Sequence, residues 1–191
     1  RGETWFRVPE SIKITLTGRM KKNVSAKDLA LWIIGMIGSD GANYMSIEYH
    51  GEGVKSLNIS DRMTIANLAS EMGAKNAVFP ADDRLQDFLG RKIKGVWADE
   101  GAKYIREIEI DLPTVFPVVA APHNVDNVRS VADMAGTVVH EALIGTCTNG
   151  RMEDMITAAK ILKNNKVAPG VVLKIVPATD NIWNQCLSKG L

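Results

Sequence analysis

Residues 138–163 read VVHEALIGTCTNGRMEDMITAAKILK, and they contain the clearest structural pattern in the chain. Residues 138–145 are a largely apolar run that ends at a glycine, which is typical of a buried strand. Residues 146–150 form a short polar loop, and residues 152–163 carry apolar side chains at helical spacing. The stretch therefore predicts a strand that enters a helix through a tight loop.

A second strand and a second helix follow directly. Residues 171–177 are again apolar, and Thr179 and Asp180 are capping residues for a helix over 181–189. Strand, helix, strand and helix with short loops predict a βαβα unit, in which the strands are parallel and the connection is right-handed. Parallel sheets bind their ligands at the carboxyl ends of the strands, and the loop at 146–150 lies at such an end.

The preceding part of the chain also alternates strands and helices, which places the chain in the α/β class. Strands are expected at 12–17, 45–50, 77–80 and 105–111. Helices are expected from the capping box at 25–28, from Ser60 and at 84–89, with a further short helix near 129–134.

A proline-rich segment separates these two parts. Pro113, Pro117 and Pro122 each remove a backbone donor and fix φ, which indicates an extended connection between domains. We expect the boundary near Thr114, with one domain at 1–114 and a second at 115–191.

The composition excludes several classes of protein. Of the 191 residues, 46% are hydrophobic and 24% are charged, which excludes disorder. The net charge of +1 gives no long-range field for nucleic acid or anionic lipid, and the longest apolar stretch, 29–37, is too short to span a bilayer. We expect a cytoplasmic protein, and, since the chain opens at Arg1 and not at a methionine, an internal piece of a longer one.

The first candidate site residue is Cys147. Its thiol lies in the loop before the helix at 152–163, where the helix dipole stabilises a thiolate and where Thr148 and Asn149 could hydrogen-bond a sulfur atom or a substrate. The alternative is a small buried cysteine without chemistry, and spacing alone does not decide between the two. Cys186 lies within the last expected helix at a core position, where we expect it to be inert.

The second candidate is Glu48. Strand alternation puts its side chain on the face opposite Ile47, beside the turn at Gly51, where a carboxylate could act as an acid or a base. The residues alone favour the alternative, a solvated strand side chain. His50 is interpreted as a hydrogen-bonded residue near the turn and not as a metal ligand.

Residues 143–154, LIGTCTNGRMED, resemble the first cluster-binding motif of the aconitase superfamily. Further segments agree with the superfamily in order and approximate spacing, so that the resemblance covers nearly the whole chain: 2–10, 25–28, 47–51, 63–67 and 71–74. Residues 122–128 and 149–151 are most similar to the branch formed by the large subunits of 3-isopropylmalate dehydratase and by homoaconitase.

The resemblance implies three-layer α/β/α domains, one complete and one partial, and a hydro-lyase that isomerises a hydroxy-diacid by dehydration and rehydration. The leading interpretation is 3-isopropylmalate dehydratase of leucine biosynthesis; homoaconitase, aconitase and dimethylmalate dehydratase are the alternatives. The cofactor implied is a 4Fe-4S cluster held by three cysteines, with Cys147 as the first thiolate. Glu48 matches the carboxylate near the iron-bound water, and Asn149 and Arg151 face the substrate or support the residues that do.

The chain also departs from the family's pattern. The other two cysteine ligands form a C-x-x-C motif that the family places downstream of Leu191, and Cys186 matches neither. The resemblance also implies a small swivelling subunit as the partner, and the sequence leaves open whether that subunit is separate or fused to the large one. We therefore predict that the 191-residue chain alone is inactive and holds no stable cluster.

Two other classes remain as hypotheses. A non-catalytic RNA-binding or regulatory module on the same scaffold is disfavoured by the near-neutral charge. A cysteine-dependent hydrolase would need a histidine next to Cys147, and His140 lies near the opposite end of the preceding strand.

Overall fold

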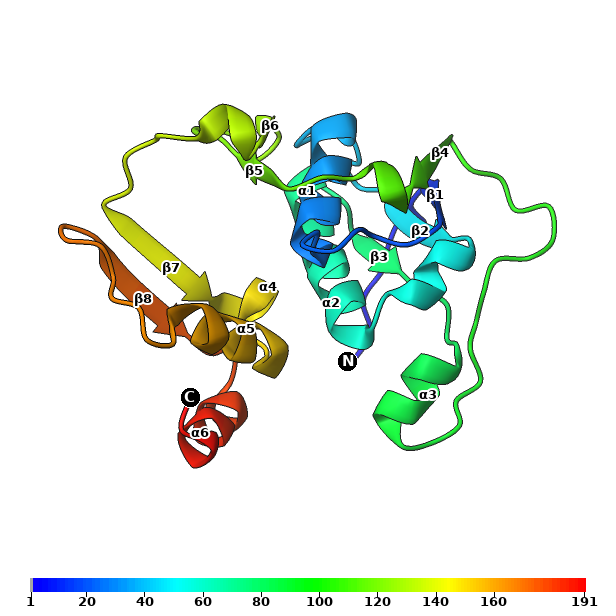
Figure 1. Cartoon of the computed structure of the whole chain (residues 1–191). Coiled ribbons are helices and arrows are strands. Elements are labelled where there is room, and N and C mark those ends of the chain that lie inside the picture. Colours follow the sequence, from blue (N-terminus) through cyan, green and yellow to red (C-terminus); the bar gives the residue numbers. More distant parts are fainter. Residues whose placement is uncertain (1) are drawn as a thin grey trace. The chain divides into compact units, whose positions relative to one another are not determined.

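A computed structural model describes residues 2–191 and divides into two compact units after Val131 (Figure 1). The first unit contains a sheet of four parallel strands in the order β3-β2-β1-β4. These strands are β1 (Ser11–Thr17), β2 (Ser46–His50), β3 (Asn76–Val78) and β4 (Arg106–Asp111). The α/β class and the four expected strands are confirmed, with bounds that differ by one or two residues at most ends.

The three α-helices of this unit begin at side-chain caps: α1 (Ala26–Ile37), α2 (Ile59–Leu68) and α3 (Asp83–Leu89). The unit also has the short 3₁₀ helices η1 (Glu52–Ser56), η2 (Ala69–Met72) and η3 (Leu112–Thr114). Ser25 and Asp28 form the expected capping box of α1. The second helix begins earlier than expected, because Asn58 and Asp61 cap it reciprocally with bonds of 2.8 and 2.9 Å.

The core lies between α1, α2 and one face of the sheet. Ile14 pairs with Tyr49 on one side and with Ile108 on the other, and this register lines up the apolar side chains of three strands. The fully buried members of the core include Ile12, Ile14, Leu16, Leu29, Ile33, Ile47 and Ile65.

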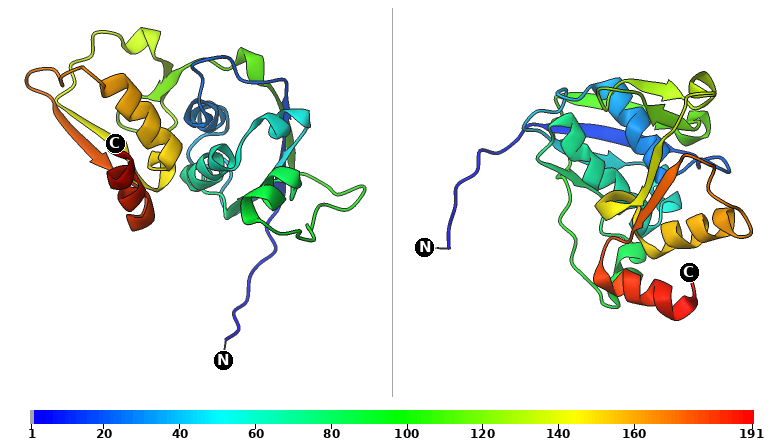
Figure 2. Two further views of the ribbon diagram at one scale, coloured as in Figure 1. Left: turned by 60° about the horizontal axis from the view of Figure 1, so that its bottom comes forward. Right: turned by 90° about the vertical axis from the view of Figure 1, so that its left-hand side faces the viewer.

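The opposite face of the sheet is polar. Lys13 lies in register between Glu48 and Glu107, and a segment at 90–105, which connects α3 to β4, crosses this face. The left view of Figure 2 shows α1 and α2 on one side of the sheet and this green segment on the other. Within residues 2–131, an extended segment lies on this face, whereas α1 and α2 cover the other face.

The proline-rich segment packs on the first unit, so the boundary comes later than Thr114. Residues 115–131 contain an antiparallel pair, β5 (Val118–Ala120) and β6 (Val128–Ser130). The backbone N–H of Val118 donates to Asp28 at 2.9 Å, and that of Ser39 donates to Asp126 at 3.0 Å. The short helix expected near 129–134 is wrong: β6 occupies its start, and only the 3₁₀ turn η4 (Ala132–Met134) follows.

The second unit has the expected βαβα order. β7 (Glu141–Gly145) and β8 (Val172–Val176) are parallel, and they alternate with α5 (Met152–Leu162) and α6 (Asp180–Lys189). The expected loop at 146–150 contains a single helical turn, α4 (Thr146–Asn149). None of the helices described at residues 2–191 has both the length and the apolar character needed to cross a membrane.

Candidate functional site

The loop that carries Cys147 is shaped by two glycines. Gly145 ends β7 with φ of 132°, and a Cβ there would collide with the carbonyl oxygen of Val176 on the neighbouring strand. At Gly150 a Cβ would lie 2.5 Å from the carbonyl oxygen of Thr146 and 2.7 Å from the nitrogen of Ala178. Glycine is the one residue that fits both positions, and the chain can therefore fold back within one turn.

The thiol of Cys147 is exposed, whereas that of Cys186 is buried in α6. Cys147 therefore does not match the alternative of a small buried cysteine. It lies in the one-turn helix α4 and not at the start of the longer helix α5, which weakens the expected effect of the helix dipole on the thiolate. His140 precedes β7 and Cys147 follows it, so the strand, about 17 Å long, separates them.

The side chains of Asn149 and Arg151 brace this loop. The Arg151 guanidinium donates to the carbonyl oxygens of Thr148 at 2.7 Å and Cys147 at 3.1 Å. The Asn149 amide donates to Asp154 at 3.1 Å, and the backbone N–H of Arg151 donates to the other oxygen of Asp154 at 3.0 Å. Asp154 is thus a site residue whose role the sequence analysis missed, although its position three residues after Arg151 has the spacing of a capping box.

Glu48 lies in a separate cluster on the polar face of the first unit. Its side chain is 20% exposed and that of His50 is 18% exposed, so Glu48 is not the solvated strand residue that the sequence favoured. The hydroxyl of Tyr104 donates to Glu48 Oε2 at 2.8 Å, and Nε2 of His50 lies 3.3 Å from the same oxygen. The ring of Trp97 covers the His50 imidazole with 4.8 Å between centroids. Sequence reasoning missed Tyr104 and Trp97.

The hydroxyl of Tyr104 is a hydrogen-bond donor over the whole physiological range. Partial burial, followed by the hydrogen bond and the charge of Glu48 and the charge of Glu107, raises the pKa of Tyr104 to about 12. The ammonium group of Lys13 pairs with Glu107 at 3.1 Å, whereas Glu48 accepts a hydrogen bond from the neutral hydroxyl of Tyr104.

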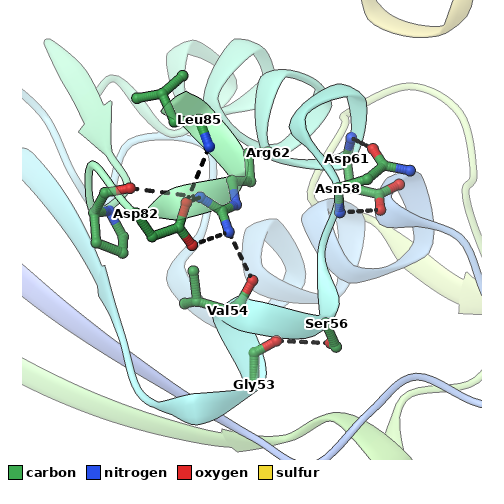
Figure 3. Close-up of polar contacts among 9 residues, drawn as sticks. Gly53, Val54, Ser56, Asn58, Asp61, Arg62, Asp82 and Leu85 are labelled. Carbon is green, nitrogen blue, oxygen red and sulfur yellow. Dashed lines mark hydrogen bonds and ion pairs between the residues drawn. The ribbon is translucent and has the colours of Figure 1, made fainter. Parts of the chain in front are cut away.

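A buried arginine ties together the segments that flank this cluster (Figure 3). Arg62 of α2 donates to Asp82 at 2.8 and 2.6 Å and to the carbonyl oxygen of Val54 at 3.2 Å. Val54 lies in η1, just after the turn that ends β2, and Asp82 caps the start of α3. The Arg62 hydrogen bond holds the pKa of Asp82 below its usual value. The pair fixes the turn after β2 against the start of α3, the helix that precedes the segment at 90–105.

The structure thus brings Cys147, Asn149 and Arg151 together in the second unit and places Glu48 in the first. Across residues 2–191, no three His, Cys, Asp or Glu side chains gather closely enough to hold a metal ion. The exposed thiol of Cys147 fits the chemistry of one cluster ligand, because iron–sulfur clusters are held by thiolates.

Comparisons with known proteins agree across the whole chain. The model of the "Aconitase family (aconitate hydratase)" matches residues 1–141 and 130–191. The chain is 47% identical to 3-isopropylmalate dehydratase large subunit 2 of Archaeoglobus fulgidus, with 100% of the chain and 47% of that protein covered. It is 46% identical to 3-isopropylmalate dehydratase large subunit of Clostridium kluyveri, with 100% of the chain and 46% of that protein covered.

The chain therefore spans about half the length of the curated relatives that it matches. The family match and the two relatives each cover the full sequence, and they lead to one conclusion. This chain belongs to the aconitase family.

Proposed function

We propose that the chain is part of the large subunit of a hydro-lyase that isomerises a hydroxy-diacid, with 3-isopropylmalate as the substrate. The observation that carries the proposal is the identity of 43% to 47% to proteins named 3-isopropylmalate dehydratase large subunit, over the whole chain. The protein's place would then be leucine biosynthesis, and its partner would be the small subunit that the name "large subunit" implies. A cytoplasmic location stays a prediction.

In this proposal Cys147 is one of the thiolates that hold a 4Fe-4S cluster, with further thiolates supplied from elsewhere in the protein. The exposure of its thiol on a loop fixed by two glycines supports this role. Such a cluster with an open iron position would supply a Lewis acid for the substrate's hydroxyl and carboxylate groups.

Three further residues have roles in this proposal: Glu48 handles a proton, and Arg151 and Asn149 hold the cysteine loop. Glu48, half-buried and hydrogen-bonded, takes or returns the proton that moves during dehydration and rehydration. Arg151 and Asn149 hold the backbone of the cysteine loop, since their side chains bond to its carbonyl oxygens and to Asp154. A fixed loop keeps the thiol in one place, which a ligand requires.

The test uses the intact protein together with its small subunit, purified and assayed without oxygen. We expect turnover of 3-isopropylmalate and little or none of homocitrate and citrate. Turnover of homocitrate or citrate in place of 3-isopropylmalate would assign the chain to another branch of the family. No turnover of any of the three acids would overturn the proposed activity, and activity of the 191-residue chain alone would contradict the prediction that it is inactive.

A further inference from the structure

Two side chains converge on a single oxygen of Glu48. Tyr104 donates to Oε2 at 2.8 Å, and His50 Nε2 lies 3.3 Å from the same atom. Tyr104 and His50 also lie 3.4 Å from each other, so the three groups form a closed triangle. Within the described residues 2–191, no hydrogen bond or ion pair engages Oε1.

We propose that Tyr104 and His50 are positioning residues, which hold Oε2 of Glu48 so that Oε1 is the oxygen left to exchange a proton with the substrate. This inference rests on the proposed function, in which Glu48 handles that proton. A carboxylate that is free to rotate would present either oxygen, whereas one held at Oε2 presents Oε1 in one orientation. Pre-organisation of this kind accelerates a reaction because the reacting group needs no reorientation.

The surroundings favour Tyr104 as the principal holder. Its phenol, whose pKa is about 12, stays protonated at neutral pH and therefore donates whenever Glu48 is ionised. Lys13, the cation nearest in register, bonds to Glu107, and its Nζ lies 5.5 Å from the centre of the Tyr104 ring. Lys13 is thus beside Glu48 in the strand register, but its ammonium group bonds to Glu107, and the neutral phenol of Tyr104 is the group that donates to Glu48.

A first experiment tests the contact without any assay of activity. In the 191-residue chain labelled with 13C-tyrosine, the titration of Tyr104 is followed by NMR in the wild type, in Glu48→Gln and in Glu107→Gln. Glu48 raises the Tyr104 pKa by both a hydrogen bond and its charge, and Glu107 only by its charge. We expect Glu48→Gln to lower the pKa of Tyr104 by more than Glu107→Gln does. Equal effects, or no effect of Glu48→Gln, would overturn the contact.

A second experiment tests the role in the intact protein with its small subunit. Tyr104→Phe should lower kcat by about 10-fold to 100-fold with little change in KM, because the variant still binds the substrate but no longer holds the carboxylate in one orientation. The matched control is Tyr44→Phe, which removes a hydroxyl from an exposed ring that contacts Lys75. It should leave both constants unchanged.

The outcomes separate this inference from the proposed function. An active wild type together with an unchanged kcat in Tyr104→Phe would overturn the positioning role alone. A wild type that turns over no hydroxy-diacid would overturn the proposed function and the catalytic purpose of the contact, while the NMR titration still decides whether the contact exists. His50→Gln, which keeps a side-chain donor, should retain more activity than His50→Ala; the reverse order would contradict the role of His50.

Discussion

Removal of the Asp82 carboxylate should destabilise the chain more than removal of its partner, the Arg62 guanidinium. The Arg62 side chain is 5% exposed and that of Asp82 is 25% exposed, although the two are paired at 2.6 Å (Figure 3). Asp82→Asn keeps the shape and the helix-capping oxygen and removes the charge. A buried cation is left behind, and this is more costly than a carboxylate that water can reach.

The magnitudes follow from what each change leaves unpaired. Breaking a buried pair from one side costs about 3–5 kcal/mol, and the partial exposure of Asp82 places Asp82→Asn at the lower end, about 3 kcal/mol. Arg62→Met leaves the buried carbonyl of Val54 without its donor, which costs about 1–2 kcal/mol. The double variant, with both Arg62→Met and Asp82→Asn, should lose little more unfolding free energy than Arg62→Met alone. Once Arg62 is replaced, removal of the Asp82 charge leaves no buried cation unpaired.

The effect also has a pH signature. The hydrogen bond and the charge of Arg62 hold the pKa of Asp82 below its usual value, so the folded state binds this proton less readily than the unfolded state does. The pair therefore contributes stability above the unfolded pKa, and this contribution is lost as the pH falls through the lower folded value. Wild type should lose stability below about pH 4 more steeply than Asp82→Asn does.

Urea unfolding followed by circular dichroism, at pH 7 and through a series down to pH 3, measures these differences. The unfolding free energies should rank the wild type first, then Arg62→Met, then Asp82→Asn at neutral pH. Two results would contradict this ranking and its cause. One is a larger loss of unfolding free energy for Arg62→Met than for Asp82→Asn. The other is an unfolding free energy that changes with pH in the same way in the wild type and in Asp82→Asn.

Three further predictions concern stability. Tyr49→Phe should raise the unfolding free energy by about 1 kcal/mol, because the buried hydroxyl of Tyr49 has no hydrogen-bond partner among the described residues. A lower unfolding free energy of the variant in urea would contradict this and would indicate that the hydroxyl has a partner. Gly145→Ala should lower the unfolding free energy by more than the roughly 1–3 kcal/mol that a strained backbone costs, because its Cβ would collide with the carbonyl oxygen of Val176. Gly170→Ala should lower the unfolding free energy by less, since a Cβ there meets open space. Equal hydrogen-exchange protection of β7 in the two variants would contradict this difference. Asp28→Ala should speed protease cleavage within 115–131, since the backbone of Val118 loses its acceptor; unchanged cleavage would count against that packing.

Local signals predicted much of the fold. The capping box of Ser25 and Asp28 involves residues three apart, so the sequence alone indicates where α1 begins. The other oxygen of Asp28 accepts from Val118, 90 residues later, and this contact holds the proline-rich segment on the first unit. No local pattern encodes this contact, and the prolines therefore indicate a domain boundary that comes earlier than the one after Val131. β6 likewise forms through its pairing with β5, which overrides the local preference that suggested a helix.

The same distinction applies to the candidate sites. Cys147, Asn149 and Arg151 are close in sequence, and the structure keeps them in one loop. The environment of Glu48 depends on Tyr104, which is 56 residues away and arrives on an irregular segment. A strand pattern can place Glu48 on the polar face of the sheet, but it cannot show which side chain covers that face.

In the proposed function, the exposed thiol of Cys147 anchors an iron–sulfur cluster in the intact protein. The most direct measurement is the iron and sulfide content of the intact protein after anaerobic reconstitution, compared between Cys147→Ser and Cys186→Ser. We expect Cys186→Ser to retain the wild-type content, because that thiol is buried in α6, and Cys147→Ser to lose the cluster. A Cys147→Ser protein with the full iron and sulfide content of the wild type would show that this thiol is not a cluster ligand.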